Sequence, residues 1–352
     1  NNGTPAGAGW TEVVIDNDLA NALSVAVADV DNDGDLDVIA GSGAGSDDLL
    51  WWINDGSPEG ASWTEVVIAA CDECESVFAT DMDNDGDVDI VAVAKDDNDV
   101  LWFKNDGSPA GAGSFTKYTI DGDFSGAVAV YASDMDNDGD VDVIAAAETG
   151  DDVSWWANDG TPSNDSWTET IIDDIFNGAR SVHTADMDGD GWMDVIAAAK
   201  DGSDVSWWVN DGTPGGADWT EYTIDGSFNG ADDIITVDID RDGDLDVLGS
   251  SEVNAGIAIW LNDGSPDNCL QIANDLSEKL EHVKSIGYSK NKGRGHAIKY
   301  AGLLHAKGDY IIYMDCDLVE DKYLRYVNTM IEKVKDYDVV VASRFLPTSN
   351  TI

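Results

Sequence analysis

The sequence predicts an all-β fold, a five-bladed β-propeller of four-stranded blades, joined to a partial α/β segment at its C-terminal end. A nine-residue acidic motif starts at Asp29, Asp81, Asp134, Asp186 and Asp238, so it recurs every 52 or 53 residues. A Trp-rich strand follows each motif, and a turn of the type N-D-G-[ST]-P follows each Trp-rich strand. A repeat of this length with four short strands has the size of a propeller blade. A linear β-solenoid normally has a shorter period and ranks second.

Short apolar runs separated by turn residues locate the strands within one repeat. Val, Ile, Ala and Trp fill the runs, whereas Gly, Asp, Asn and Pro fill the gaps. A run of the type WTEVVI ends each of the first four repeats, as at residues 63–68, whereas the last repeat has none after Trp260 and residues 10–15 are a spare copy of it. In the first unit we expect strands near residues 10–15, 23–28, 36–40 and 48–53.

The charge of the chain is strongly negative and unevenly spread. There are 71 acidic and 18 basic residues, for a formal net charge of −53. Residues 1–267 hold 60 acidic and 6 basic residues, whereas residues 268–352 hold 11 acidic and 12 basic ones. Such a chain repels nucleic acid and anionic membranes, so both are discounted as partners, and it attracts cations. The break in charge predicts two segments, residues 1–266 and residues 267–352.

The acidic motif D-x-D-x-D-G-x-x-D has the pattern of a calcium-binding loop. Carboxylates at positions 1, 3, 5 and 9 and a backbone carbonyl at position 7 supply oxygen ligands, and Gly at position 6 permits the sharp turn. Five intact copies argue against a merely solvated acidic turn. The predicted metal ligands are Asp29, Asp31, Asp33, Asp35 and Asp37; Asp81, Asp83, Asp85, Asp87 and Asp89; Asp134, Asp136, Asp138, Asp140 and Asp142; Asp186, Asp188, Asp190, Trp192 and Asp194; and Asp238, Asp240, Asp242, Asp244 and Asp246.

These loops, each followed by an apolar strand such as Val38-Ile39-Ala40, resemble the FG-GAP/VCBS repeats of integrin-α-like propellers. The resemblance covers residues 1–267. It implies about one structural calcium ion per blade, an extracellular or cell-surface location, and a role in binding, adhesion or scaffolding with a protein or glycan partner. By analogy with related propellers, the strand carrying Ser24–Ala28 is innermost. The spare strand at residues 10–15 is then expected to complete the last blade and close the ring.

The repeats show no catalytic constellation. His183 is their only histidine, and a lone histidine is more often a packed or surface residue. Adjacent Trp residues in a strand point to opposite faces, so one should fill the space between blades. The other is either packed or a platform for a sugar ring, as in a lectin. No further zinc ligands accompany the CxxC pair Cys71 and Cys74, which argues against a zinc site. The pair is a small-loop disulfide or two free thiols, and a redox pair is the alternative.

Residues 268–352 alternate predicted helices and strands, which is typical of an α/β fold. The segments Asp263-Gly264-Ser265-Pro266-Asp267-Asn268, Ser289–Ala297 and Met314-Asp315-Cys316-Asp317 resemble motifs of family 2 glycosyltransferases of the dolichyl-phosphate mannose synthase type. The resemblance implies that Asp315 and Asp317 hold Mg²⁺ or Mn²⁺ on a nucleotide-sugar diphosphate, and that Asp263 contacts the nucleoside.

The family's first nucleotide-fold strand and its acceptor region are missing from these residues. The sequence therefore predicts no transfer activity and a protein that is not an enzyme. The alternative is a glycosyltransferase with an accessory propeller. No signal peptide and no run of 18 apolar residues is present, and the chain begins in the middle of a repeat.

Overall fold

A computed structural model describes residues 12–58, 63–108, 115–164, 167–216, 219–240, 243–253 and 256–262. The chain divides into two units, Asn1–Gly264 and Ser265–Ile352. All described elements belong to the first unit. The helices and strands predicted beyond residue 267, together with Asp242, Asp263, Asp315 and Asp317, lie outside the described residues.

The described part of the chain is built from five antiparallel sheets, which we call blades one to five in chain order. Blade one contains β1 (Ala22–Ala28), β2 (Asp37–Ser42), β3 (Asp48–Ile53) and β4 (Thr64–Ala70). Blade two contains β5 (Cys74–Thr80), β6 (Asp89–Ala94), β7 (Asp99–Asn105) and β8 (Phe115–Asp121). Blade three contains β9 (Ala127–Ser133), β10 (Asp142–Ala147), β11 (Asp152–Ala157) and β12 (Thr168–Asp173), with the 3₁₀ turn η1 (Pro162–Asn164) before β12. Blade four contains β13 (Ala179–Ala185), β14 (Asp194–Ala199), β15 (Asp204–Val209) and β16 (Thr220–Asp225), and blade five contains β17 (Ala231–Val237), β18 (Asp246–Ser251) and β19 (Gly256–Trp260).

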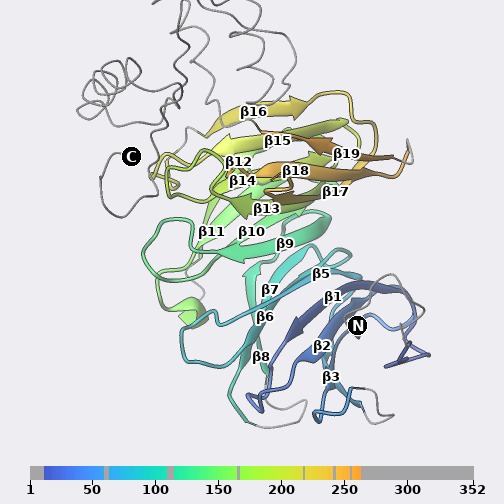
Figure 1. Ribbon diagram of the computed structural model, residues 1–352. Helices are drawn as coiled ribbons and strands as arrows, with labels where there is room; N and C mark the ends of the chain where they lie inside the picture. The colour runs from blue at the N-terminus through green and yellow to red at the C-terminus, as the bar shows by residue number, and fades with distance from the viewer. Residues whose placement is uncertain are drawn as a thin grey trace, which may run out of the picture. The chain divides into compact units, whose positions relative to one another are not determined.

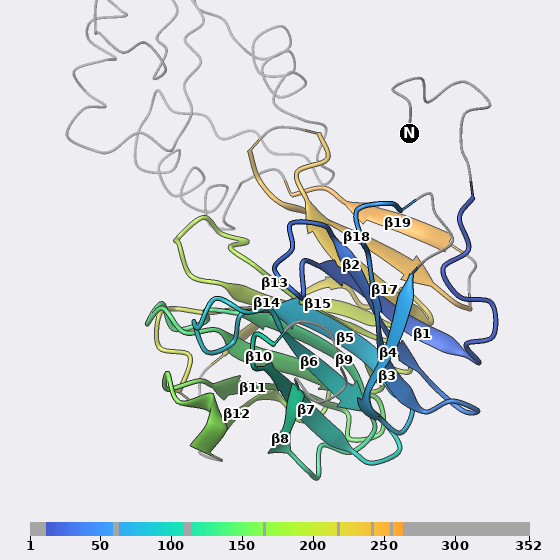
Figure 2. The ribbon, with the colours of Figure 1, turned by 90° about the horizontal axis from the view of Figure 1, so that it is seen from below.

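The blades follow one another in chain order, from the blue first sheet to the orange fifth sheet (Figures 1 and 2). Within each blade the strands pair with their neighbours in sequence, so every blade is a meander. The first strands of successive blades pack on one another, β1 on β5, β5 on β9, β9 on β13 and β13 on β17. This arrangement confirms the predicted all-β fold with propeller-like blades, and it places the WTEVVI-type strand β4 at the outer edge of blade one.

The hydrophobic core lies between the blades. One buried cluster joins Ile39, Leu49 and Trp51 of blade one to Val77 and Ile90 of blade two. Equivalent clusters join blade two to three, three to four, and four to five. The second strands of blades two, three and four are buried along their whole length, which explains their continuous apolar sequences, such as DIVAVA in β6.

Blade five differs from the prediction. Among the described residues its sheet has three strands, and residues 12–15 form no strand against it. Instead Ile15 and Leu19 pack on Ala40, Leu50 and Trp52 of blade one. The predicted closure by residues 10–15 is therefore wrong for the described part of that segment. The physical reason is proximity, because Ile15 lies only seven residues before the start of β1 and an apolar face of its own blade is close to it.

A network of ion pairs crosses the blade junctions near the start of the inner strands. Lys95 Nζ lies 3.3 Å from Glu75 and 2.8 Å from Glu148 of the next blade. Arg180 lies 3.7 Å from Glu148 and 3.3 Å from Asp232 of blade five. These pairs are partly exposed, so each adds little to stability alone, but together they connect four blades.

Candidate metal sites in the five acidic loops

Each acidic loop joins the first two strands of a blade and is shaped by its own hydrogen bonds. The backbone N–H at position 6 donates to the carboxylate at position 1 in all five loops, as from Gly86 to Asp81 at 2.9 Å. Position 4 has a positive φ in the first four loops, 57° at Asn32, Asn84 and Asn137 and 77° at Gly189. Asn and Gly tolerate this conformation better than most residues, which explains their presence at position 4.

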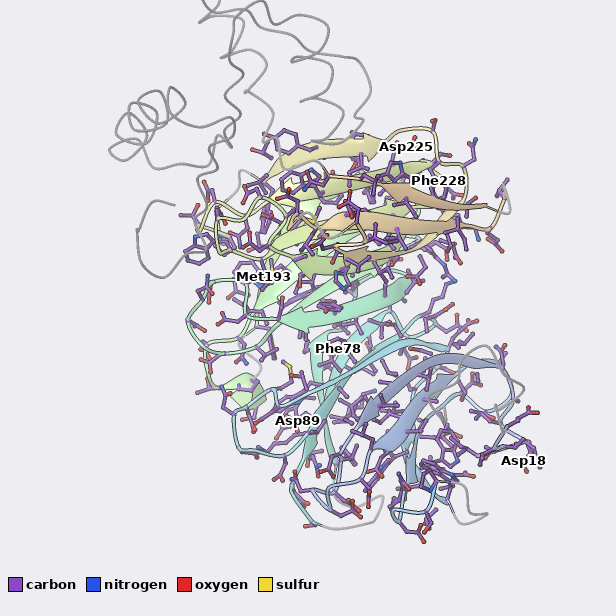
Figure 3. All side chains as sticks on the ribbon, in the orientation of Figure 1. Asp18, Phe78, Asp89, Met193, Asp225 and Phe228 are labelled. Atoms are coloured by element: carbon purple, nitrogen blue, oxygen red, sulfur yellow. The ribbon has the colours of Figure 1, made fainter. Side chains whose placement is uncertain are left out.

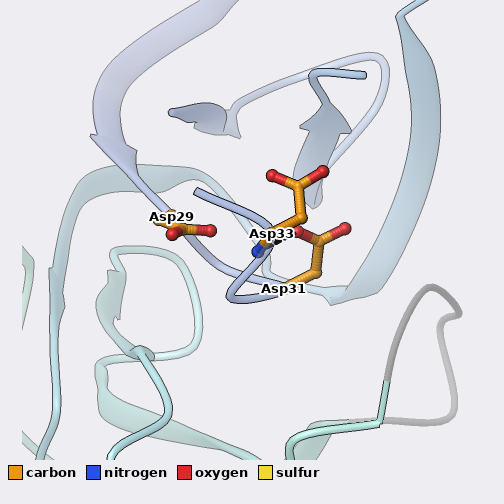
Figure 4. A group of neighbouring side chains, drawn as sticks. All are labelled: Asp29, Asp31 and Asp33. Carbon is orange, nitrogen blue, oxygen red and sulfur yellow. Dashed lines mark hydrogen bonds between the residues drawn. The ribbon is translucent and has the colours of Figure 1, made fainter. Parts of the chain in front are cut away.

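The loops bring three carboxylates together in every blade. Ligand oxygens lie within 4.8 Å of one another in the groups Asp29, Asp31 and Asp33; Asp81, Asp83 and Asp85; Asp134, Asp136 and Asp142; Asp186, Asp188 and Asp194; and Asp238, Asp240 and Asp246. Positions 1 and 3 thus take part in all five groups, and position 5 or position 9 completes each one. Figure 4 shows the first group, in which the side chains of Asp31 and Asp33 lie beside each other and Asp29 lies on the preceding part of the loop.

Unpaired buried oxygens show that a cation fits these groups. One carboxylate oxygen of Asp29, of Asp83, of Asp134 and of Asp186 is buried and accepts no hydrogen bond. A buried carboxylate oxygen without a partner is costly, and like charges at this distance repel. A divalent cation that prefers oxygen ligands removes both costs, and calcium accepts the flexible geometry of such a loop.

The aspartate at position 9 is a structural residue as well as a possible ligand. Asp37, Asp89, Asp142, Asp194 and Asp246 are fully buried. In blade three, Asp142 accepts hydrogen bonds from the backbone N–H of Met135 at 2.9 Å and of Asn158 at 2.7 Å. The same pair of bonds recurs in every other blade. Figure 3 shows Asp89 among the packed strands, whereas Asp18 lies at the periphery.

Burial perturbs these carboxyl groups. It raises the pKa of Asp89, Asp142 and Asp194 to about 7, although the backbone donors act in the opposite direction. It also raises the pKa of Asp37. Without a cation nearby, these groups therefore hold a proton more strongly than an exposed aspartate does.

The Asn of each N-D-G-[ST]-P turn is the functional residue that the sequence did not reveal. Asn158 Nδ2 donates to Val141 O of its own loop at 3.0 Å and to Met82 O of the preceding loop at 3.0 Å. Asn105, Asn210 and Asn262 make the equivalent bond to the preceding loop. The strict recurrence of this Asn was visible in the sequence, but only as a turn signal.

The loops also contact one another directly. Asn84 Nδ2 donates to Asp140 Oδ1 at 3.0 Å and to Gly139 O at 3.3 Å in the next blade. Asn32 makes the same contacts with Asp87 and Gly86. The position 7 side chains therefore lie outside the carboxylate groups, and the predicted role of the position 7 carbonyls, Trp192 included, stays a prediction.

The other candidate residues have structural surroundings. Trp51 and Trp52 are both buried, as are Trp155 and Trp156, so these pairs pack on both faces of their strands and offer no platform for a sugar. His183 lies between Tyr131, at 4.5 Å between ring centroids, and Thr236. Cys71 and Cys74 are buried free thiols, and their mutual hydrogen bond and burial raise the pKa of the Cys74 thiol.

Comparison with known proteins assigns the repeats. A model described as FG-GAP-like repeat matches residues 29–92, 81–145, 134–197 and 186–249. The chain belongs to the FG-GAP-like repeat family. A solved structure of a putative 6-phosphogluconolactonase from Bacteroides uniformis covers 67% of this chain and 69% of its own, with 13% sequence identity and a TM-score of 0.41. No helix among the described residues is long and apolar enough to span a membrane.

A second family matches the C-terminal part. The model Glycosyl transferase family 2 matches residues 258–351. Two relatives from Bacillus subtilis, the putative glycosyltransferase CsbB and the uncharacterized glycosyltransferase YkcC, are 40% identical over 86 residues and 39% identical over 87 residues. Each alignment covers 24% of this chain, and the chain spans 25% and 26% of the two relatives. The glycosyltransferase AglD of Haloferax volcanii is 31% identical over 91 residues, which are 25% of this chain and 14% of that protein.

These matches overturn one prediction. The expectation that the protein is not an enzyme rested on segments missing from the C-terminal residues. Yet the matched range includes Asp263, Asp315 and Asp317, the residues to which the resemblance assigns the nucleotide sugar and its metal. The motifs that bind the nucleotide sugar in the family are thus better evidence about activity than the missing segments are. The prediction that the protein is not an enzyme is wrong.

Lys104 makes the second loop different from the others. Its ammonium group pairs with Asp83 and lies 2.8 Å from Asp85, so this carboxylate group already holds a cation. The equivalent residues of the other blades, Ile53, Ala157, Val209 and Leu261, are apolar. We expect Lys104→Met to tighten calcium binding at this loop by about tenfold, because the competing charge is lost.

Calorimetric titration of the metal-free protein measures this effect. Lys117→Met is the matched control, since Lys117 pairs with Asp99 at 3.7 Å outside the acidic loops. Unchanged or weaker calcium binding in Lys104→Met would contradict the competing role of the lysine.

The raised pKa values predict an unusual pH dependence of the metal-free protein. A carboxyl with a folded pKa near 7, above its unfolded value near 4, contributes stability that is complete below the unfolded pKa. This stability disappears as the pH rises through the folded pKa. In chelator, we expect the free energy of unfolding to fall between about pH 4 and pH 7, by on the order of 1 kcal/mol per pH unit for each of these groups.

Urea unfolding at a series of pH values tests this expectation. Repulsion among the many surface carboxylates acts in the same direction. Asp142→Asn isolates the buried groups, because it should remove one group's share of the slope. Saturation with calcium should flatten the slope further. A metal-free protein that gains stability across this range would disprove the assignment.

Proposed function

We propose that the repeats form a calcium-stabilised β-propeller that serves as an extracellular binding or scaffold module. The observation that carries this proposal is the recurrence of three converging carboxylates in each of five loops, with a buried unpaired oxygen in four of them. In this proposal Asp residues at positions 1, 3, 5 and 9 hold about one calcium ion per blade. The calcium concentrations outside cells suit loops of this type.

Calcium in these loops would stabilise the junctions between blades as well as the loops. The backbone carbonyl at position 2 of a loop accepts a hydrogen bond from the turn Asn of the next blade, as Met82 O does from Asn158. Each of the first three loops also contacts the following loop through its position 4 Asn. An ion that orders one loop therefore orders an acceptor and a donor that the neighbouring blade uses. The rigid arrangement of blades would then hold the acidic surface in one shape for binding to a protein or glycan partner.

Calcium binding can be tested loop by loop. Titration calorimetry of the metal-free protein should detect about five calcium ions per chain, one for each carboxylate group. Asp134→Asn should remove one of them, because it neutralises a buried unpaired oxygen while keeping an acceptor for the N–H of Gly139. It should also lower the calcium-dependent gain in melting temperature.

Asp140→Asn is the matched control. Asp140 lies in the same loop, but it is outside the carboxylate group and accepts from Asn84 of the preceding blade. Equal calcium stoichiometry in wild type and Asp134→Asn, or no calcium binding by the wild type, would refute the proposal. If magnesium bound with the same stoichiometry and raised the melting temperature equally, the loops would be divalent-cation sites without selectivity for calcium.

A second function is favoured by the match of residues 258–351 to Glycosyl transferase family 2. We propose that this segment binds a nucleotide-diphosphate sugar and takes part in glycosyl transfer. Asp315 and Asp317 would hold Mg²⁺ or Mn²⁺ on the diphosphate, where the cation neutralises the charge of the leaving group. Asp263 would contact the nucleoside. The propeller would then be an accessory module of a transferase.

Nucleotide binding tests this second function. UDP and GDP are titrated into the full chain with and without Mn²⁺, because the donor is not identified. We expect metal-dependent binding of one nucleotide and its loss in the double variant Asp315→Asn/Asp317→Asn. Asp321→Asn, a nearby aspartate outside the D-x-D motif, should bind as the wild type does. Binding that survives in the double variant would contradict the assignment.

A further inference from the structure

The corner between the outer strand of one blade and the inner (first) strand of the next has the same construction where the chain enters blades three, four and five. A phenylalanine in the corner packs edge-on against a Trp of its own blade, with 4.9 Å between the ring centroids. The residue directly before the inner strand is a glycine with a φ of 70° or 71°. The residues concerned are Phe124, Phe176 and Phe228, with Gly126, Gly178 and Gly230.

The corner that enters blade two has neither feature. It consists of residues 71–73 and contains no aromatic side chain, and Phe103 occupies the strand position of Trp156. Glu73, directly before β5, has a φ of 52°. This left-handed backbone conformation is costly for a residue with a Cβ and a long side chain. The corner therefore carries backbone strain without the aromatic contact that fixes the later corners, and Cys71 and Cys74 flank the strained residue.

The two cysteine side chains lie together at this corner. Both are buried, with 1% of Cys71 and 0% of Cys74 exposed, in the apolar cluster between blades one and two. Their thiols are hydrogen-bonded to each other. The backbone fixes both residues, because Cys71 N donates to Asp47 O at 2.9 Å and Cys74 pairs with Ala94 in β6. The two sulfur atoms are thus held as neighbours, which closure of a disulfide requires.

The strand beside Cys74 in blade one leaves room for its sulfur atom. A Cβ added to Gly41 of β2 would lie 2.9 Å from Cys74 Sγ, so a larger residue would displace the thiol. Val93, Ala146 and Ala198 occupy the strand position of Gly41 in blades two, three and four, where the next inner strand begins with Ala. Cys74 and Gly41 are therefore a complementary pair at the junction of blades one and two.

The surroundings of the pair favour a permanent cross-link over a thiol that exchanges. A reactive CxxC pair has an accessible thiol with a lowered pKa. Here the hydrogen bond with Cys71 and burial both raise the pKa of the Cys74 thiol. Among the residues that the structure describes, the groups able to hold a metal ion consist of aspartates, so no such group involves these sulfur atoms.

We propose that Cys71 and Cys74 form an intrachain disulfide that cross-links the corner between blades one and two. Closure breaks two S–H bonds and forms one S–S bond. The two electrons and two protons pass to the disulfide of a thiol–disulfide oxidoreductase or of oxidised glutathione, which becomes two thiols. The reaction takes place during folding, before the corner is buried. The cross-link rests on the extracellular location proposed above, because disulfides persist in oxidising surroundings.

The disulfide stabilises the entry to blade two as the aromatic contact stabilises the entries to the later blades. It spans Glu73 and limits the backbone conformations of the unfolded chain at this point. The closed loop contains only the residues 71–74, so the stabilisation is at the lower end for a disulfide. Reduction should therefore lower the melting temperature by about 4 °C.

Thiol alkylation of the full chain, followed by tryptic mass mapping, tests the proposal. Lys95 is the first basic residue, so the tryptic peptide of residues 1–95 contains Cys71 and Cys74 and no other cysteine. The chain is produced by secretion through an oxidising compartment, denatured and alkylated with iodoacetamide. We expect no alkyl group on this peptide, and two after reduction with dithiothreitol. Alkyl groups on the peptide before reduction, or a bond from it to Cys269 or Cys316, would overturn the proposal.

Melting curves in calcium, with and without dithiothreitol, measure the stabilisation. The reductant should lower the melting temperature of the wild type and leave that of Cys71→Ser/Cys74→Ser unchanged. Cys269→Ser/Cys316→Ser is the matched control and should respond as the wild type does, because it keeps the pair. If the first variant fails to fold, the peptide map of the wild type still decides. A wild type whose melting temperature ignores the reductant would contradict the cross-link.

Calcium titration of the same samples separates the two proposals. A chain that contains the disulfide and binds no calcium would refute the calcium-stabilised module and leave the cross-link standing. A chain that binds calcium while its peptide of residues 1–95 carries two free thiols would refute the cross-link alone.

Discussion

The buried carboxylate at position 9 of each loop is the interaction on which the rest of the blade depends. Its two oxygens bind the backbone at the start of the loop and the backbone after the Trp-rich strand, as Asp142 binds Met135 and Asn158. These hydrogen bonds hold the start of the loop, the start of the second strand and the turn after the Trp-rich strand around one carboxylate. The arrangement is costly unless that charge is neutralised, by a proton or by a cation in the adjacent carboxylate group. In the three blades where this aspartate also belongs to the carboxylate group, a bound cation would link metal binding to blade folding through one side chain.

Much of the fold followed from the sequence because the repeat supplies five observations of the same pattern. Period, strand positions and loop residues all recur, so chance matches are averaged out. Closure was misjudged because Trp10–Ile15 matches the outer strand in sequence, whereas Ile15 finds a nearer apolar face on blade one. A local pattern does not report which of two similar faces a segment will cover.

The candidate sites were predicted to the level of ligand type, and their connections were not. The motif identified the carboxylates, but Asn158 and its equivalents bond to residues about 76 positions away in the chain. Contacts of that range depend on how blades stack, which no local spacing encodes. Lys104 was equally hidden, since only the fold brings β7 beside the acidic loop of blade two.

The identity of the blade junctions also bears on how such a molecule changes in evolution. When nearest neighbours alone determine stability, one repeat can be gained or lost without new kinds of contact at the seam. Duplication of a segment of 52 residues would insert a blade whose leading and trailing sides already match its neighbours. Recombination between repeats could then change the number of blades, while each new junction would keep the residue types of the existing ones.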